Sequence, residues 1–197
     1  MRGILGIGNP GVKYKKNRHN VGYSLLEKFA ESKSLDFIPS KGDYYIALGK
    51  QNKESYCIIK PTTYVNKTGQ AALQVIEQYE IKLVDLLVIC DDINLKAGQF
   101  RIRRKGGDGG HNGLASIIYN FNSNNFPRIR IGVGNDFDRG QLSSYVLNDF
   151  SLEEEKMLTT VFKNLVLLLD EFIERGYNSM LNVNSKLKND EPGPKIN

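Results

Sequence analysis

The strongest constraint on the fold is a continuous apolar run, Leu86 to Cys90, followed directly by the carboxylates Asp91 and Asp92. An apolar run without polar interruptions is typical of a strand buried on both faces of a parallel sheet. Such a strand needs helices on both sides. We therefore expect an α/β fold, a single three-layer domain with a twisted mixed, mostly parallel sheet flanked by helices. The carboxylates would lie at the carboxyl end of a central strand, where α/β sheets place their ligand crevice.

The rest of the chain alternates strand-like with helical segments. Further strands are expected at Arg2 to Gly8, Tyr44 to Leu48, Tyr56 to Ile59, Phe100 to Arg103 and Ile129 to Val133, the second and third forming a hairpin. Helices are expected from an Asn20 cap to Ser32, over Thr68 to Tyr79, and from a capping box at Ser151 to Gly176. Residues 1–185 would form the domain. Residues 186–197 have little to bury and would form a flexible C-terminal tail.

Composition places the chain among ordinary globular proteins, with 40% hydrophobic and 25% charged residues and a net charge of +5. Its apolar runs fall far short of the roughly 18 residues that a membrane span requires. The N-terminal apolar segment is interrupted at Gly8 before a signal-peptide core can form. Cys57 and Cys90 lie in strand-like runs, and His19 and His111 are too few and too scattered for a recognised metal spacing. We expect a cytoplasmic protein without a membrane segment, structural metal or disulfide.

A glycine pattern near the N-terminus, Gly6 to Gly11, fits the dinucleotide fingerprint G-x-G-x-x-G after a strand. That fingerprint requires a helix to open at the glycines. Here Pro10 and a basic segment follow, and no apolar helical pattern starts before Asn20. The pattern therefore does not favour a nucleotide-dependent oxidoreductase, an alternative that predicts a cofactor bound to the purified protein.

Three features could supply chemistry at the strand ends. His19 stands among polar residues at the start of a helix, where it could act as a base or merely help to cap the helix. A carboxylate after the central strand could orient its imidazole, or belong to a solvated turn. The glycine-rich loop from Gly106 to Gly113 includes Asn112, whose amide can both donate and accept hydrogen bonds near a ligand. A merely flexible connection is the alternative for that loop.

Positive charge gathers beside these segments. A basic surface around a crevice, with Tyr14 and Tyr64 available for stacking, suits a polyanion with exposed terminal bases, although a solvated charged face has the same pattern. The basic clusters are Lys13 to Arg18, Arg101 to Lys105, and Arg128 with Arg130.

Five segments taken together resemble the bacterial peptidyl-tRNA hydrolase family. They occur in the family's order and span roughly residues 2–185. The resemblance implies a compact, monomeric hydrolase without metal, cofactor or obligate protein partner, which cleaves the ester between a peptide and the 3′ ribose of tRNA. The segments are Gly8-Asn9-Pro10-Gly11-x-x-Tyr14, Arg18-His19-Asn20-x-Gly22, Lys60-Pro61-Thr62-Thr63-Tyr64-Val65-Asn66-x-x-Gly69, Cys90-Asp91-Asp92 and Gly109-Gly110-His111-Asn112-Gly113.

The resemblance also implies roles for individual residues. His19 corresponds to the general base, Asp91 to the carboxylate that supports it, and Asn9 to the residue that distinguishes N-blocked from free aminoacyl esters. It implies contacts with the substrate for Tyr14, Tyr64, Asn66 and Asn112. It implies that Arg103 and Arg130 are the cations that clamp the 5′ phosphate of tRNA.

The chemistry of the residues agrees with ester hydrolysis, because a neutral imidazole held by a carboxylate can take a proton from water near pH 7. The chain has no G-x-S-x-G elbow, so direct attack by water is favoured over an acyl-enzyme. Asn66 or backbone N–H groups of a site loop would stabilise the oxyanion. Preferring Asp91 to Asp92 depends on strand register. The alternative function is a non-catalytic RNA-binding protein on the same fold, which would not need His19 and Asp91.

Overall fold

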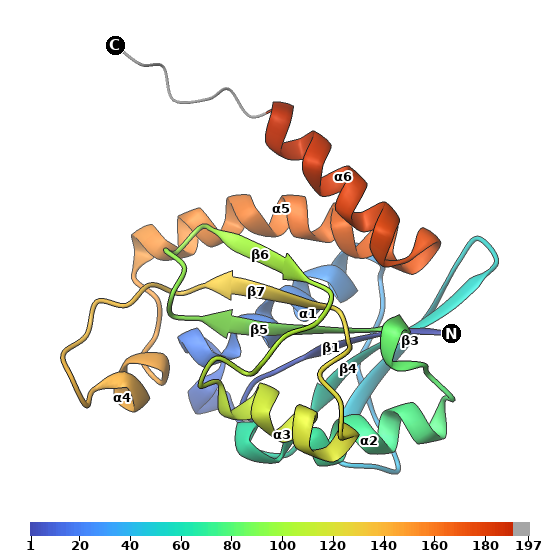
Figure 1. The fold of residues 1–197 in the computed structure, drawn as a ribbon, viewed down its shortest axis with the longest axis horizontal. Coiled ribbons are helices and arrows are strands. Elements are labelled where there is room, and N and C mark those ends of the chain that lie inside the picture. The colour runs from blue at the N-terminus through green and yellow to red at the C-terminus, as the bar shows by residue number, and fades with distance from the viewer. Residues whose placement is uncertain (191–197) are drawn as a thin grey trace.

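A seven-stranded mixed sheet forms the middle layer of the computed structural model, which describes residues 1–190 (Figure 1). The strand order is β2-β3-β4-β1-β5-β7-β6. The strands are β1 (Arg2–Gly6), β2 (Ile38–Pro39), β3 (Tyr44–Gln51), β4 (Glu54–Pro61), β5 (Leu86–Asp92), β6 (Phe100–Arg103) and β7 (Arg128–Gly132). The α-helices are α1 (Val21–Ser32), α2 (Thr68–Gln78), α3 (Asn112–Phe121), α4 (Leu142–Val146), α5 (Leu152–Arg175) and α6 (Tyr177–Asp190).

The sheet confirms the predicted α/β class, but parallel pairing is restricted to its centre. Strand β1 pairs in parallel with β4 and β5, and β5 pairs in parallel with β7. The outer pairs β2–β3, β3–β4 and β6–β7 are antiparallel. The sheet is thus evenly mixed rather than mostly parallel, because the predicted hairpin β3–β4 and the returning strand β6 add antiparallel neighbours on both sides.

Two apolar cores, one on each face of the sheet, account for the three layers. Helices α1, α5 and α6 pack on one face through residues such as Leu26, Leu169 and Met180. Helices α2 and α3 cover the other face through residues such as Val75 and Ile117. All seven residues of β5 are buried, as the apolar run predicts for a central strand.

The C-terminal third contains both a confirmed prediction and a correction. Ser151 and Glu154 form the predicted capping box at the start of α5, and that helix ends before Gly176, whose φ of 82° suits glycine. A separate helix, α6, then continues to Asp190. Residues 186–190 are therefore helical and not a tail, because Met180 and Leu187 give α6 an apolar side that packs on the core. The remainder of the expected tail, residues 191–197, lies outside the described residues.

Within residues 1–190, no helix is both long enough and apolar enough to cross a membrane.

The carboxyl ends of β1, β5 and β7 meet at one end of the sheet, on the left in Figure 1, where α4 also lies. The loops that leave these strands come together there with the start of α3. This convergence makes that end of the sheet the place where a site can form.

Candidate active site

A cavity of about 510 Å³ lies at this end of the sheet. Its lining includes polar residues of the strand ends and the glycine loop, and residues of α4 and its flanks such as Leu142 and Val146. The predicted site residues that line the cavity are Asn9, His19, Tyr64, Asn66, Asp91, Asn112 and Arg130.

His19 and Asp91 are in direct contact. His19 lies in a 3₁₀ turn, Arg18–Asn20, that leads into α1, and its Nδ1 is 2.7 Å from Oδ1 of Asp91. Burial lowers the pKa of His19, but the Asp91 carboxylate raises it by more, so the pKa stands above the ordinary 6.5. The imidazole side chain is 14% exposed, so His19 is paired and desolvated while still open to the cavity.

His111 is a site residue that the sequence analysis missed. Its Nε2 lies 2.9 Å from the same Asp91 oxygen that His19 contacts, and the two imidazole rings are 5.1 Å apart. The fold therefore corrects the expectation that the two histidines are scattered. The available signal was the position of His111 in the glycine loop beside Asn112, at the same end of the sheet as Asp91.

The environment of Asp91 keeps it ionised. The carboxylate side chain is 4% exposed, and burial alone raises its pKa. His111 and His19 lower that pKa by more, through charge and hydrogen bonds, so it falls well below the usual range. The neighbouring Asp92 is directed elsewhere, with Oδ2 3.6 Å from Arg130 Nη1 and Oδ1 accepting from the Asn94 N–H. The strand register thus places Asp91, and not Asp92, against His19.

Asn9 is held in one orientation by two partners. Its Oδ1 accepts a hydrogen bond from the Val65 N–H at 3.1 Å. The Asn20 side chain accepts from the Asn9 N–H and donates to the Asn9 carbonyl, both at 2.9 Å. The sequence analysis expected the Asn20 side chain to cap α1, and the structure shows that it does not. The amide of Asn20 instead fixes the loop after β1. With Oδ1 occupied, Asn9 has its Nδ2 donor available for a ligand.

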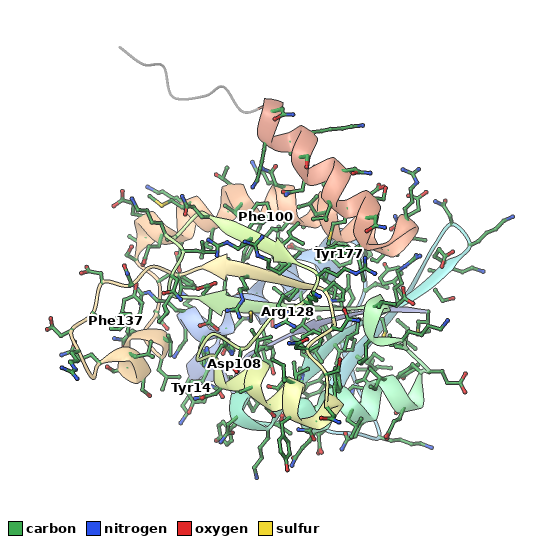
Figure 2. The ribbon with its side chains drawn as sticks, in the orientation of Figure 1. Tyr14, Phe100, Asp108, Arg128, Phe137 and Tyr177 are labelled. Atoms are coloured by element: carbon green, nitrogen blue, oxygen red, sulfur yellow. The ribbon has the colours of Figure 1, made fainter. Side chains whose placement is uncertain are left out.

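The remaining predicted contact residues lie on the cavity wall or next to it. Tyr64 is 58% exposed, and Tyr14 meets it edge-on with ring centroids 6.5 Å apart. Tyr14 does not line the cavity itself but lies at the same end of the sheet as the start of α3 (Figure 2). Asn66 and Asn112 are exposed on the cavity wall. These side chains can contact parts of a ligand that extend out of the cavity.

The two predicted clamp arginines have different surroundings. Arg130 lines the cavity and donates from Nη2 to the carbonyls of Gly107 and Asp108 at 3.1 and 2.8 Å. Arg103 is exposed on β6, outside the cavity. The structure therefore brings Arg130 to the site and leaves Arg103 on the adjacent surface.

Arg128 is a third arginine beside this loop. It is 1% exposed and stacks on Phe126, and burial lowers its pKa to about 10. It donates to the carbonyls of Gly106 and Asn124, both at 2.8 Å. Figure 2 shows Arg128 near Asp108, in the loop before α3. Arg128 and Arg130 thus both fix the glycine loop.

Four arginines lie on one face of the β6–β7 pair. Arg128 is directly opposite Arg103, and Arg130 is directly opposite Arg101. Directly opposed residues share a sheet face, so this face is strongly basic.

Other chemistries find less support in the geometry. His19, Asp91 and His111 bring ligand-type atoms within 4.8 Å of one another, but both imidazole nitrogens that point to Asp91 already hydrogen-bond to it. No α-helix opens at the N-terminal glycines, since a 3₁₀ turn follows and α1 begins at Val21. Both cysteines are buried, and burial raises the pKa of the Cys57 thiol to about 12. What the site does offer is an imidazole held by a buried carboxylate at a cavity wall, an arrangement typical of hydrolases.

Comparisons with known proteins agree with this class. The family described as Peptidyl-tRNA hydrolase matches residues 3–191. A Chlorobaculum parvum protein named peptidyl-tRNA hydrolase is 43% identical over 82% of this chain and 85% of its own. One from Clostridium tetani is 38% identical over 91% of this chain and 94% of its own. A crystal structure of peptidyl-tRNA hydrolase from Acinetobacter baumannii has a TM-score of 0.87 at 26% identity, covering 94% of this chain and 95% of that one. The chain belongs to the peptidyl-tRNA hydrolase family, which confirms the resemblance drawn from its motifs.

Proposed function

We propose that this chain hydrolyses the ester between a peptide and the 3′-terminal ribose of tRNA, with His19 as general base and Asp91 as its support. The observation that carries the proposal is the 2.7 Å contact between His19 Nδ1 and Asp91 Oδ1 at the cavity wall. When Nδ1 donates to Asp91, Nε2 is the nitrogen that can accept a proton from water.

The proposed reaction uses one water molecule. Its oxygen attacks the ester carbonyl carbon while His19 Nε2 takes a proton, and the bond from that carbon to the ribose oxygen then breaks. The proton passes to the ribose oxygen, so the products are a free peptide acid and tRNA with a 3′ hydroxyl. The negative charge that develops on the carbonyl oxygen needs donors, and the exposed Asn66 amide or backbone N–H groups of a site loop are proposed for that role.

Asn9 is proposed to distinguish N-blocked from free aminoacyl esters. Because Val65 occupies its Oδ1, Asn9 offers the cavity a donor. A donor suits the carbonyl oxygen of a peptide or another N-acyl group. A free α-ammonium group presents donors of its own and gains no hydrogen bond there.

The activity is tested by release of free tRNA from an N-blocked aminoacyl-tRNA, with the free-amino ester as control and a chelator present throughout. We expect rapid cleavage of the blocked ester only. Binding of tRNA without cleavage would instead support the non-catalytic RNA-binding alternative, which the hydrolase names of the relatives do not favour.

The rate should depend on pH through His19. A general base works in its neutral form, so kcat/KM should rise with pH as His19 loses its proton. Since Asp91 holds the pKa of His19 above 6.5, the midpoint of the acid limb should lie above 6.5. The measurement is kcat/KM for the blocked ester between about pH 5 and pH 9. A midpoint below 6.5 would show that another group controls the reaction.

Arg103 and Arg130 are proposed to hold the tRNA, and the structure predicts different effects for the two. Arg103→Ala removes an exposed cation, so it should raise KM for tRNA substrates and lower the slope of log KM against log salt concentration by about one. It should leave the hydrolysis of a minimal ester without the tRNA body unchanged. Arg130→Ala also frees the Gly107 and Asp108 carbonyls, so it should impair both substrates. Equal loss on both substrates for Arg103→Ala would contradict its assignment.

The remaining features of the proposal concern the setting of the reaction. We propose a monomer that acts in the cytoplasm, needs neither cofactor nor obligate protein partner, and uses residues 1–185, extended by the end of α6, as its catalytic domain. In support of the compartment, both cysteines are free and buried, as suits a reducing environment.

A further inference from the structure

We propose that His111 is a positioning residue: helix α3 fixes the tautomer of its imidazole, which then holds Asp91 and sets the protonation of His19. The proposal rests on the proposed role of His19 as base. It starts from a contact that the hydrolytic scheme does not use, the hydrogen bond between His111 and Asp91.

The first step is the cap of α3. His111 is the N-cap residue, and its Nδ1 accepts hydrogen bonds from the N–H groups of Gly113 and Leu114 at 3.1 and 3.3 Å. A ring nitrogen that accepts from N–H groups carries a lone pair and no proton. The neutral imidazole must therefore carry its hydrogen on Nε2. Protonating Nδ1 as well would break the cap and leave two N–H groups at the helix start without a partner.

The second step concerns the two hydrogen bonds that Asp91 accepts. The N–H at Nε2 of His111 donates to Asp91 Oδ1 at 2.9 Å, and the same oxygen accepts from His19 Nδ1 at 2.7 Å. An ionised carboxylate can only accept hydrogen bonds, so both imidazoles must donate to it. His19 is thereby held as the Nδ1–H tautomer, with the lone pair of Nε2 available for water.

The third step is electrostatic. The Asp91 carboxylate accepts hydrogen bonds from two imidazoles, and the bond from His111 weakens the stabilisation that Asp91 gives to the charged form of His19. The other charged groups on the cavity wall are Asp92 and Arg130, which pair with each other at 3.6 Å. Arg18, beside His19 in the chain, pairs with Glu154 at 2.8 Å. His111 is thus the second group, beside His19, that hydrogen-bonds to the Asp91 carboxylate and moderates its charge.

Two substitutions separate the two bonds of His111. His111→Asn keeps an acceptor at the capping position but loses the donor to Asp91. His111→Gln can still reach Asp91 with an N–H but loses the cap. We expect His111→Asn to move the acid limb of kcat/KM upward by about half a unit to one unit, because the whole Asp91 charge then acts on His19. We expect His111→Gln to keep the wild-type midpoint of the acid limb, whatever its rate, and to lower Tm.

The proposal is overturned if His111→Asn keeps the wild-type pH profile, or if His111→Gln shifts the profile equally. Imidazole ¹⁵N spectra of the wild-type protein test the tautomer without any variant. At the pH where the enzyme is most active, a lone pair on Nδ1 of His111 supports the proposal, and a proton on that nitrogen overturns it. These spectra do not depend on activity, so they still report on His111 if the role of His19 as base fails its own test.

Discussion

Replacing His19 with alanine should lower kcat/KM for an N-blocked aminoacyl-tRNA by about 10²- to 10⁴-fold, the range expected for loss of a general base. Within residues 1–190, Nε2 of His19 is the one imidazole nitrogen at the cavity without a hydrogen-bond partner, since both nitrogens of His111 are bonded. The measurement is release of free tRNA under single-turnover conditions, which separates the chemical step from product release.

The affinity of the His19→Ala protein for tRNA gives the control. The proposed tRNA contacts lie on β6, β7 and the tyrosines on or next to the cavity wall, so binding should stay within about twofold of wild type. Tyr119→Ala, a change at an 86% exposed side chain on α3, serves as the matched surface variant and should keep full activity. Retention of more than a tenth of the wild-type rate by His19→Ala would remove His19 from its assigned role.

The sequence predicts the centre of this fold well because its signals there are local. The run from Leu86 to Cys90 has no polar residue, so it predicts a strand buried on both faces, and all of β5 is buried. The capping box at Ser151 depends on residues three apart and appears as predicted. The evenly mixed pairing was harder to predict, because the direction of β6 depends on its contact with β7 and not on its own residues.

The site was predicted in part for the same reason. His19 and Asp91 each stand in a recognisable segment, whereas the contact of His111 with Asp91 joins residues from different loops and exists only after α3 packs on the sheet. Asn20 shows the limit of local rules. Its position favours a helix cap, yet the amide bonds to Asn9, because tertiary contacts offer it two hydrogen bonds. Helix α6 was missed because its apolar residues are sparse and its packing partners lie elsewhere in the chain.

Asp91→Asn should lower kcat/KM by about 10²- to 10⁴-fold, mainly through the imidazoles that it contacts. An amide of the same shape has no charge to stabilise the imidazolium of His19, and its NH₂ group repels N–H donors in one of its two orientations. A His19 ring that turns its N–H toward the cavity no longer offers a lone pair to water. The loss should therefore appear in kcat, with KM for tRNA close to the wild-type value.

Asp92→Asn is the matched control, because it makes the same chemical change one residue along β5. Asp92 faces Arg130 and the Asn94 N–H rather than His19, so its substitution should cost no more than about tenfold, through the glycine loop that Arg130 holds. The acid limb of the pH profile gives a second distinction. Without the Asp91 charge, burial dominates at His19 and its pKa should fall, so the limb of Asp91→Asn should move down, whereas that of Asp92→Asn should stay close to wild type. If the two variants lose activity equally, the contact between Asp91 and His19 does not support catalysis. The two carboxylates would then contribute only through the total negative charge at this end of the sheet.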